Sequence, residues 1–186
     1  ISSYVYGKPK HLPIDESHVL ESTNPYSETK LIGEKICKAY NKYYGLKSII
    51  LRPSNLYGPG QDERFLVPTI FKQAKSGKIF LKDPLPKRDY IFVDDFVDCL
   101  IRVIDDTKHS FDIFNVGFGK SFSIKEIVQR VNNLYDNNLD VFFDDEKRTS
   151  EISDNVLNIS KIKKAFDWRP KIDLDQGLSI LFNAIK

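Results

Sequence analysis

Methionine is absent from the 186 residues, and cysteine occurs only twice. Cys37 and Cys99 lie far apart among apolar residues, without the spacing of a metal or redox pair, so both are predicted to be small core side chains. No initiator methionine precedes Ile1, which reads like the middle of a buried strand. We therefore expect this chain to be a piece of a longer protein.

An excess of charge is also missing, because 28 Lys and Arg stand against 26 Asp and Glu, a net charge of +2. This balance gives no electrostatic basis for binding nucleic acid or an anionic membrane. No apolar run approaches the roughly 18 residues of a membrane span, and the first residues do not resemble a signal peptide. The expected protein is cytoplasmic, with neither nucleic acid nor membrane as a partner.

Strand-like and helix-like segments alternate along the chain, which predicts an α/β fold. Asn24 and Pro25 are predicted to open a long helix that stops near Gly45, and residues 48–51 form an apolar run typical of a buried parallel strand. Asp94 and Ser123 are predicted caps of later helices, Ser123 in a capping box with Glu126. The other predicted helices cover about 67–75, 94–104, 123–135, 160–166 and 173–185, and the other strands 89–93, 111–116 and 140–143.

Tyr26 and Lys30 form a Tyr-x-x-x-Lys motif in the first turn of the long predicted helix. Four residues apart on a helix, the two side chains lie on one face, where the ammonium group favours the tyrosinate form. Such a tyrosine can act as a general base or acid toward a sugar hydroxyl. The same lysine can also hold a ribose hydroxyl.

This spacing is weak evidence on its own, because it also occurs at Tyr4/Lys8, Tyr6/Lys10 and Tyr43/Lys47. Gly7 and Pro9 prevent a helix around the first two pairs, and Gly45 ends the helix at the third. Tyr26 alone lies in the first turn of a long helix. The alternative, which the spacing alone favours, is an exposed tyrosine beside an exposed lysine.

Longer segments around the motif follow one another in a distinctive order. They are Ser2–Gly7 (SSYVYG), Asn24–Lys30 (NPYSETK), Leu51–Gly60 (LRPSNLYGPG), Lys87–Asp95 (KRDYIFVDD), Asn115–Gly117 (NVG), Arg148–Glu151 (RTSE) and Trp168–Pro170 (WRP). In this order the chain resembles, over nearly its whole length, the extended short-chain dehydrogenases that act on nucleotide sugars, with UDP-glucose 4-epimerases most alike. The resemblance implies NAD as cofactor, a nucleotide sugar as substrate and a homodimer built partly on the helix that carries Tyr26.

The resemblance also implies roles for individual residues near the motif. Ser2 matches the catalytic Ser or Thr that hydrogen-bonds the reacting sugar oxygen, with Ser3 as a rival and a local strand-end bond as the alternative. Tyr26 matches the catalytic tyrosine, and Lys30 matches its lysine partner. Pro53 falls where the family's backbone meets the nicotinamide end of NAD.

Three further residues match positions that contact the substrate in the family. Asn55 falls where a side-chain amide reaches the sugar; a turn-forming asparagine is the alternative. Arg88 and Arg148 match two arginines that clamp the diphosphate, for which the planar guanidinium fork is suited. The alternatives are surface salt bridges, such as Arg88 with Asp89. After Arg148 the sequence departs from the family, with Ser150-Glu151 replacing a glycine and an acid.

The residues after Ser2 favour one branch of the family. Dehydratases usually carry two acids after the catalytic threonine, and the decarboxylases tend to keep a glutamate there, but here Ser3 and Tyr4 follow. We therefore expect a 4-epimerase of a UDP-hexose that works through a transient 4-keto sugar. The alternatives are a 4,6-dehydratase, a decarboxylase, a reductase or a non-catalytic nucleotide-binding relative.

The family's Gly-x-x-Gly-x-x-Gly turn, which binds the NAD pyrophosphate, does not occur in this sequence. We therefore expect the C-terminal part of a Rossmann-like doubly wound parallel sheet plus a small α/β substrate-binding domain, without the first βα units. Residues 1–60 would belong to the Rossmann-like part and 61–186 mainly to the nucleotide-sugar-binding region, with helix 94–106 and strand 111–117 returning to the sheet. We expect the chain alone to bind NAD poorly and to be inactive.

Overall fold

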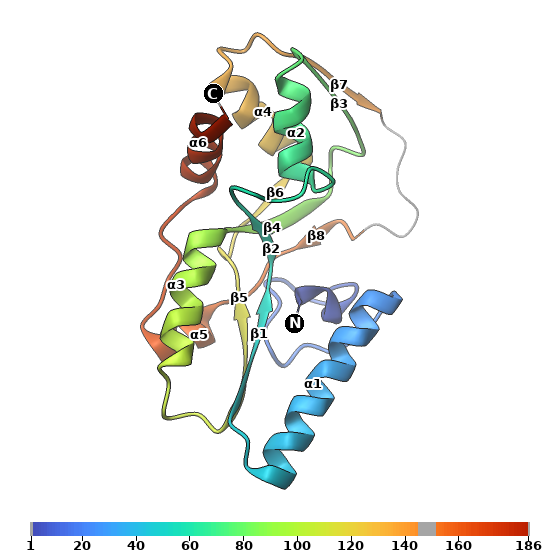
Figure 1. Ribbon diagram of the computed structural model, residues 1–186. Coiled ribbons are helices and arrows are strands. Elements are labelled where there is room, and N and C mark those ends of the chain that lie inside the picture. The colour runs from blue at the N-terminus through green and yellow to red at the C-terminus, as the bar shows by residue number, and fades with distance from the viewer. Residues whose placement is uncertain (1, 145–151, 186) are drawn as a thin grey trace.

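The computed structural model describes residues 2–144 and 152–185 and shows the expected α/β fold (Figure 1). The helices are the 3-10 helix η1 (Ser3–Tyr6), α1 (Pro25–Tyr44), α2 (Leu66–Ala74), α3 (Val93–Ile104), α4 (Ile124–Leu134), α5 (Ser160–Phe166) and α6 (Leu174–Ile185). The strands are β1 (Ser48–Pro53), β2 (Asn55–Tyr57), β3 (Lys78–Lys82), β4 (Lys87–Phe92), β5 (Phe111–Val116), β6 (Ser121–Ser123), β7 (Asp140–Asp144) and β8 (Asp154–Asn155). None of the described helices is long and apolar enough to cross a membrane.

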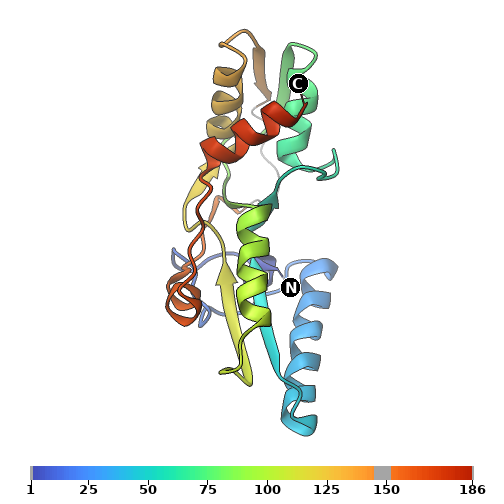
Figure 2. The same ribbon diagram turned by 60° about the vertical axis from the view of Figure 1, so that its left-hand side comes forward.

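Three separate strand groups organise the described part of the molecule. β1 pairs with β5 in parallel, from Ser48 opposite Phe111 to Pro53 opposite Val116. β4 is the centre of the second group, parallel to β2 and β8 and antiparallel to β6. β3 and β7 form a further parallel pair. Helices α1 and α3 flank β1 and β5, whereas α2, α4 and α6 gather at the other end of the molecule (Figures 1 and 2).

Local signals place the long helix α1 as predicted. The Asn24 side chain accepts the backbone N–H of Ser27 at 2.9 Å, and the Ser27 hydroxyl accepts the backbone N–H of Asn24 at 3.3 Å. Gly45 ends the helix with φ of 67°, a left-handed conformation that glycine adopts without steric cost. The predicted capping box of Ser123 and Glu126 is also confirmed at the start of α4.

The predicted cap at Asp94 is wrong. β4 runs directly into α3, so Phe92 occupies the cap position without a side-chain bond, and Asp94 lies inside the first turn. A carboxylate there still interacts favourably with the helix dipole. The neighbouring Asp95 is buried and accepts the backbone N–H groups of Lys171 and Ile172, both at 2.9 Å, which fastens the segment before α6 to α3.

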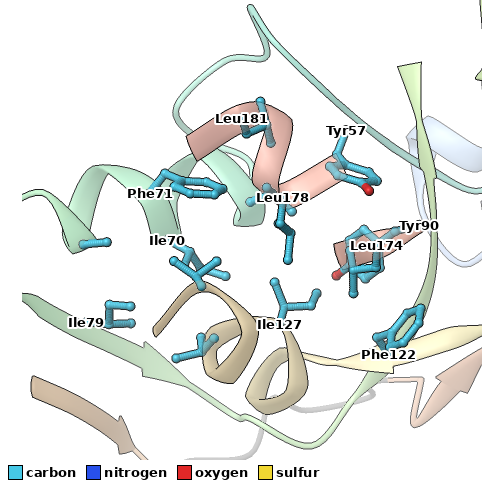
Figure 3. Close-up of a cluster of buried hydrophobic side chains, with 14 of the residues drawn as sticks. Tyr57, Ile70, Phe71, Ile79, Tyr90, Phe122, Ile127, Leu174, Leu178 and Leu181 are labelled. Atoms are coloured by element: carbon cyan, nitrogen blue, oxygen red, sulfur yellow. The ribbon is translucent and has the colours of Figure 1, made fainter. Parts of the chain in front are cut away.

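Buried apolar side chains form two clusters. One lies between α2, α4 and α6 and contains Ile70, Ile127 and Leu178, which point toward one another in Figure 3. The other surrounds β5 and α5 and includes Phe114 and Trp168. Cys99 belongs to this second cluster as predicted, whereas Cys37 on α1 is only half-buried. The predicted division at residue 60 stays a prediction.

Candidate active site

A cavity of about 310 Å³ opens where β1 ends and β2 begins. Pro53 is the last residue of β1 and therefore stands at the carboxyl end of the parallel pair β1–β5, and Asn55, two residues later, begins β2. Ligands of open α/β sheets bind at this end. The lining residues are Ser2, Tyr4, Tyr26, Pro53, Ser54, Asn55, Leu56, Tyr57, Gln61, Phe65, Leu66, Val67 and Tyr90.

The proton-transfer candidates come from two segments that meet at this cavity. Tyr26 in the first turn of α1 is 54% exposed, so its ring is accessible to a ligand. The Lys30 Nζ lies 5.1 Å from the centre of the Tyr26 ring, as expected for one helix face. Ser2 is the N-cap of η1, where its hydroxyl accepts the Tyr4 backbone N–H at 3.3 Å. Ser2 therefore makes the local bond and also faces the cavity, whereas Ser3 is not among the lining residues.

The other three Tyr-x-x-x-Lys pairs are in different settings. Tyr6 is fully buried, and η1 ends at this residue, so neither Tyr4 nor Tyr6 shares a helix with its lysine. Tyr43 is 70% exposed in the last turn of α1, and its lysine, Lys47, follows Gly45 outside the helix. The context that distinguished Tyr26 in the sequence is thus present in the structure.

A second cavity, of about 370 Å³, adjoins the first. Arg88 lines it, together with Arg64 and Thr69. The two cavities together form one cleft from Tyr26 to Arg88, because they share the lining residues Tyr4, Asn55, Phe65, Leu66 and Tyr90.

Arg88 is held in this cleft by backbone oxygen atoms. Its Nη1 donates to the carbonyl groups of Lys87 at 2.7 Å and of Ile152 at 2.6 Å. The alternative partner, Asp89, accepts backbone N–H groups from elsewhere, including those of Phe118 and Gly119. Arg148, the second predicted phosphate-binding arginine, lies outside the described residues.

Asn55 and Tyr90 join the two halves of the cleft. They are directly opposite each other in the β2–β4 pairing. Burial raises the pKa of the Tyr90 hydroxyl, although the Arg88 charge and a hydrogen bond from Asn55 act in the opposite direction. Tyr90 therefore stays protonated at neutral pH and offers a neutral hydroxyl beside the Asn55 amide.

Sequence reasoning missed several residues that line the cleft, namely Tyr4, Gln61, Phe65 and Tyr90. For Tyr90 a signal existed, because alternate residues of a strand share a face, and Tyr90 is two residues beyond Arg88 on β4. Phe65 and Gln61 belong to a connection without regular structure, which leaves no periodic pattern to read.

The residues present fit one end of NAD. Tyr26 and Lys30 carry groups that could hold a ribose hydroxyl, and Pro53 lines the cavity at the end of β1, whereas Lys30 is not among the lining residues. The glycine-rich turn for the pyrophosphate is absent from this sequence. Among residues 2–144 and 152–185, no cluster of His, Cys, Asp and Glu side chains is arranged to hold a metal ion.

Comparisons with known proteins show the family of the chain. The model of the NAD dependent epimerase/dehydratase family matches residues 1–117. A putative UDP-glucose 4-epimerase from Methanocaldococcus jannaschii is 32% identical over 187 residues, covering 98% of this chain and 60% of the relative.

Two solved structures show the same fold. A dTDP-glucose 4,6-dehydratase from Bacillus anthracis, in complex with NAD, is 28% identical with a TM-score of 0.85, over 100% of this chain and 60% of that one. A UDP-glucuronic acid 4-epimerase from Bacillus cereus, with UDP-glucuronic acid and NAD, is 25% identical with a TM-score of 0.88, over 99% of this chain and 59% of that one. The chain thus spans about three fifths of these proteins, and it belongs to the NAD-dependent epimerase/dehydratase family, the extended short-chain dehydrogenases that its motifs resemble.

Proposed function

We propose that this chain supplies the proton-transfer groups and the nucleotide-sugar site of an NAD-dependent 4-epimerase of a UDP-hexose. One observation carries the proposal: Ser2, Tyr26 and Asn55 line one cavity that continues into the cavity lined by Arg88. A nucleotide sugar has the matching order of parts, with a sugar at one end and a diphosphate next to it.

In the proposed reaction the Tyr26 oxygen removes the proton from the sugar 4-hydroxyl. Ser2 hydrogen-bonds the same sugar oxygen, and the Lys30 ammonium lies on the same helix face as Tyr26, 5.1 Å from the centre of its ring. Bound NAD supplies the hydride acceptor and donor for C4 of the sugar. Asn55 and the neutral Tyr90 hydroxyl hold the sugar, while Arg88, and by the same resemblance Arg148, bind the diphosphate. The 4-keto sugar then rotates in the cavity so that its other face is presented. Return of the hydride to C4 and of the proton from Tyr26 to the sugar oxygen gives the 4-epimer.

The lining of the Tyr26 cavity favours epimerisation over dehydration. No Asp or Glu is among its lining residues in the part of the chain that the structure describes. Elimination of water needs an acid or base beside the sugar in addition to the tyrosine. Tyr4 occupies the position where the dehydratases usually carry an acid. A dehydratase, decarboxylase or reductase remains the alternative within the family, and a non-catalytic nucleotide-binding relative is the alternative outside catalysis.

Turnover in this proposal requires the NAD-binding half that the relatives carry in the part of their length not matched here. A homodimer is also proposed, because α1 presents apolar side chains outward. Ile32, Ile36 and Tyr40 on this helix are each about half exposed, at 47%, 51% and 51%. Size-exclusion chromatography with light scattering tests the dimer, and an Ile36→Glu variant should elute as a monomer.

The decisive experiment uses the protein with its NAD-binding half, loaded with NAD and incubated with UDP-glucose, UDP-N-acetylglucosamine and UDP-glucuronic acid in turn. Proton NMR of the products should show the 4-epimer of one of them. A 4-keto-6-deoxy sugar as the product would establish a dehydratase instead. Tight binding of UDP without any turnover would establish a binding protein.

A further inference from the structure

Arg52 and Glu34 form a buried ion pair that the proposed chemistry does not use. Arg52 on β1 is 1% exposed, and Glu34 on α1 is 6% exposed. The Arg52 Nε donates to Glu34 Oε1 at 2.8 Å and its Nη2 donates to Glu34 Oε2 at 2.6 Å, a bidentate geometry. Neither residue lines the cleft, so neither touches the substrate.

The third nitrogen of Arg52 extends this pair across the molecule. Its Nη1 donates to the Tyr6 hydroxyl at 2.9 Å, and the Tyr6 hydroxyl donates to Asn115 Oδ1 at 2.6 Å. The Asn115 amide nitrogen in turn donates to the Ile14 carbonyl at 2.9 Å. Burial raises the pKa of Tyr6 to about 12, despite the nearby Arg52, so Tyr6 keeps the proton that it donates.

The segments joined by Arg52 are those that carry the proton-transfer residues. Glu34 lies on α1, four residues after Lys30 and eight after Tyr26, or about 12 Å along the helix. Tyr6 is the last residue of η1, which begins directly after Ser2. One guanidinium, on the strand that ends at the cavity, is therefore bonded to both segments.

Stability alone does not explain a buried ion pair of this kind. Removing two charges from water costs much of what their attraction returns, and well-packed apolar residues of similar volume often serve a fold equally well. Directional hydrogen bonds, in contrast, fix the distance and angle between the elements they join. A proton transfer depends steeply on such distances.

We propose that Arg52 is a positioning residue, which through Glu34 and Tyr6 sets the separation of Tyr26 from Ser2. This inference rests on the proposed function. It predicts that the network acts on the chemical step and leaves binding of the nucleotide sugar almost unchanged.

The test compares four variants of the protein with its NAD-binding half. The double variant Glu34→Leu/Arg52→Met replaces the ion pair with apolar residues. Tyr6→Phe removes one hydroxyl and keeps the ring, and Arg52→Lys keeps the charge but loses the fork. The control, Asp98→Leu/Arg102→Met, removes an exposed ion pair of α3, whose Nε–Oδ2 distance is 3.2 Å.

The double variant should keep its Tm within a few degrees while kcat falls about 10- to 100-fold and KM changes less than about threefold. Tyr6→Phe should lower kcat about 3- to 10-fold, again with little effect on KM. Arg52→Lys should also have a lower kcat than wild type, although it keeps the positive charge. The control should retain both constants. A larger isotope effect with 4-deuterated substrate would not be produced by partial unfolding, and it should accompany the lower kcat.

Wild-type kcat in Tyr6→Phe or in Arg52→Lys would overturn the positioning role, even if the double variant failed to fold. A parallel rise of KM would also overturn it, because the network would then shape the binding site. If the wild-type protein itself shows no turnover with any nucleotide sugar, the proposed function fails, and this inference fails with it.

Discussion

Arg88 and Asp89 are neighbours on β4 whose side chains serve opposite faces of the strand. Arg88 lines the cleft, whereas Asp89 is fully buried and accepts the backbone N–H groups of Phe118 at 2.9 Å, Gly119 at 3.0 Å and Leu157 at 3.3 Å. One residue faces the ligand, and the next holds two distant segments against the strand that positions it.

Asp89 should give the protein a distinct pH dependence of stability. Burial raises the pKa of Asp89 from 3.8 to about 6, against the opposing effect of its N–H donors. The folded state holds this proton more tightly than the unfolded state. The contribution of protonated Asp89 to the free energy of unfolding is therefore complete below about pH 4 and is lost as the pH rises through about 6. The loss amounts to about 3 kcal/mol.

The measurement is urea denaturation of wild type and Asp89→Asn between pH 4 and pH 7. The variant lacks the titrating group. The free energy of unfolding of wild type minus that of the variant should therefore fall as the pH rises. If this difference rises with pH instead, the three N–H donors outweigh burial, and the Asp89 pKa is lowered.

Replacing Arg88 should weaken binding of the nucleotide. Arg88→Met removes the guanidinium from the cleft, and UDP should bind about 10- to 100-fold more weakly, since a charge-assisted contact contributes about 1.5–3 kcal/mol. Isothermal titration calorimetry with UDP measures this. Arg102→Met on α3 is the control. If both variants bind UDP with equal affinity, Arg88 does not bind the diphosphate.

Tyr26→Phe should abolish turnover without destabilising the fold. The ring is more than half exposed, so loss of its hydroxyl should leave Tm unchanged. The loss of the general base should lower kcat by about 10²- to 10⁴-fold. Tyr43→Phe, in the same helix and with the same spacing to a lysine, is the matched control and should keep wild-type activity. Substantial activity in Tyr26→Phe would favour the non-catalytic interpretation of the motif.

Residues 1–186 alone should bind NAD weakly. In the proposed assignment the sequence carries groups for one end of the dinucleotide only, and it lacks the glycine-rich turn for the pyrophosphate. Tryptophan quenching is unsuitable, because the single tryptophan, Trp168, is buried. Saturation-transfer NMR should give a dissociation constant well above micromolar, and micromolar affinity would contradict this expectation.

The sequence predicts the parts of this fold that depend on neighbouring residues. The caps at Asn24 and Ser123 follow from side chains that bond within three residues, and both are found where predicted. β6 and β8 were not predicted, because they are three and two residues long and exist only through their pairing with β4. Short strands of this kind depend on partners that are remote in the sequence.

The site divides in the same way. Tyr26 and Lys30 share one helix turn, so their motif can be recognised in the sequence. The partners of Arg52, in contrast, are 18 and 46 residues away. Nothing near Arg52 in the sequence indicates that it would be buried rather than exposed. A bidentate partner on another element decides this, and such a partner becomes visible only in three dimensions.

Among the described residues, β1 has a strand partner on one edge alone. Within residues 2–144 and 152–185 it pairs only with β5, which leaves the backbone N–H and C=O groups of its other edge without a neighbouring strand. An unpaired edge is a template for adding another strand. The NAD-binding half that the proposed function requires, if produced separately, should therefore reassemble with this chain by strand addition, as in a split-protein reporter. Recovery of turnover on mixing the two halves would demonstrate this contact.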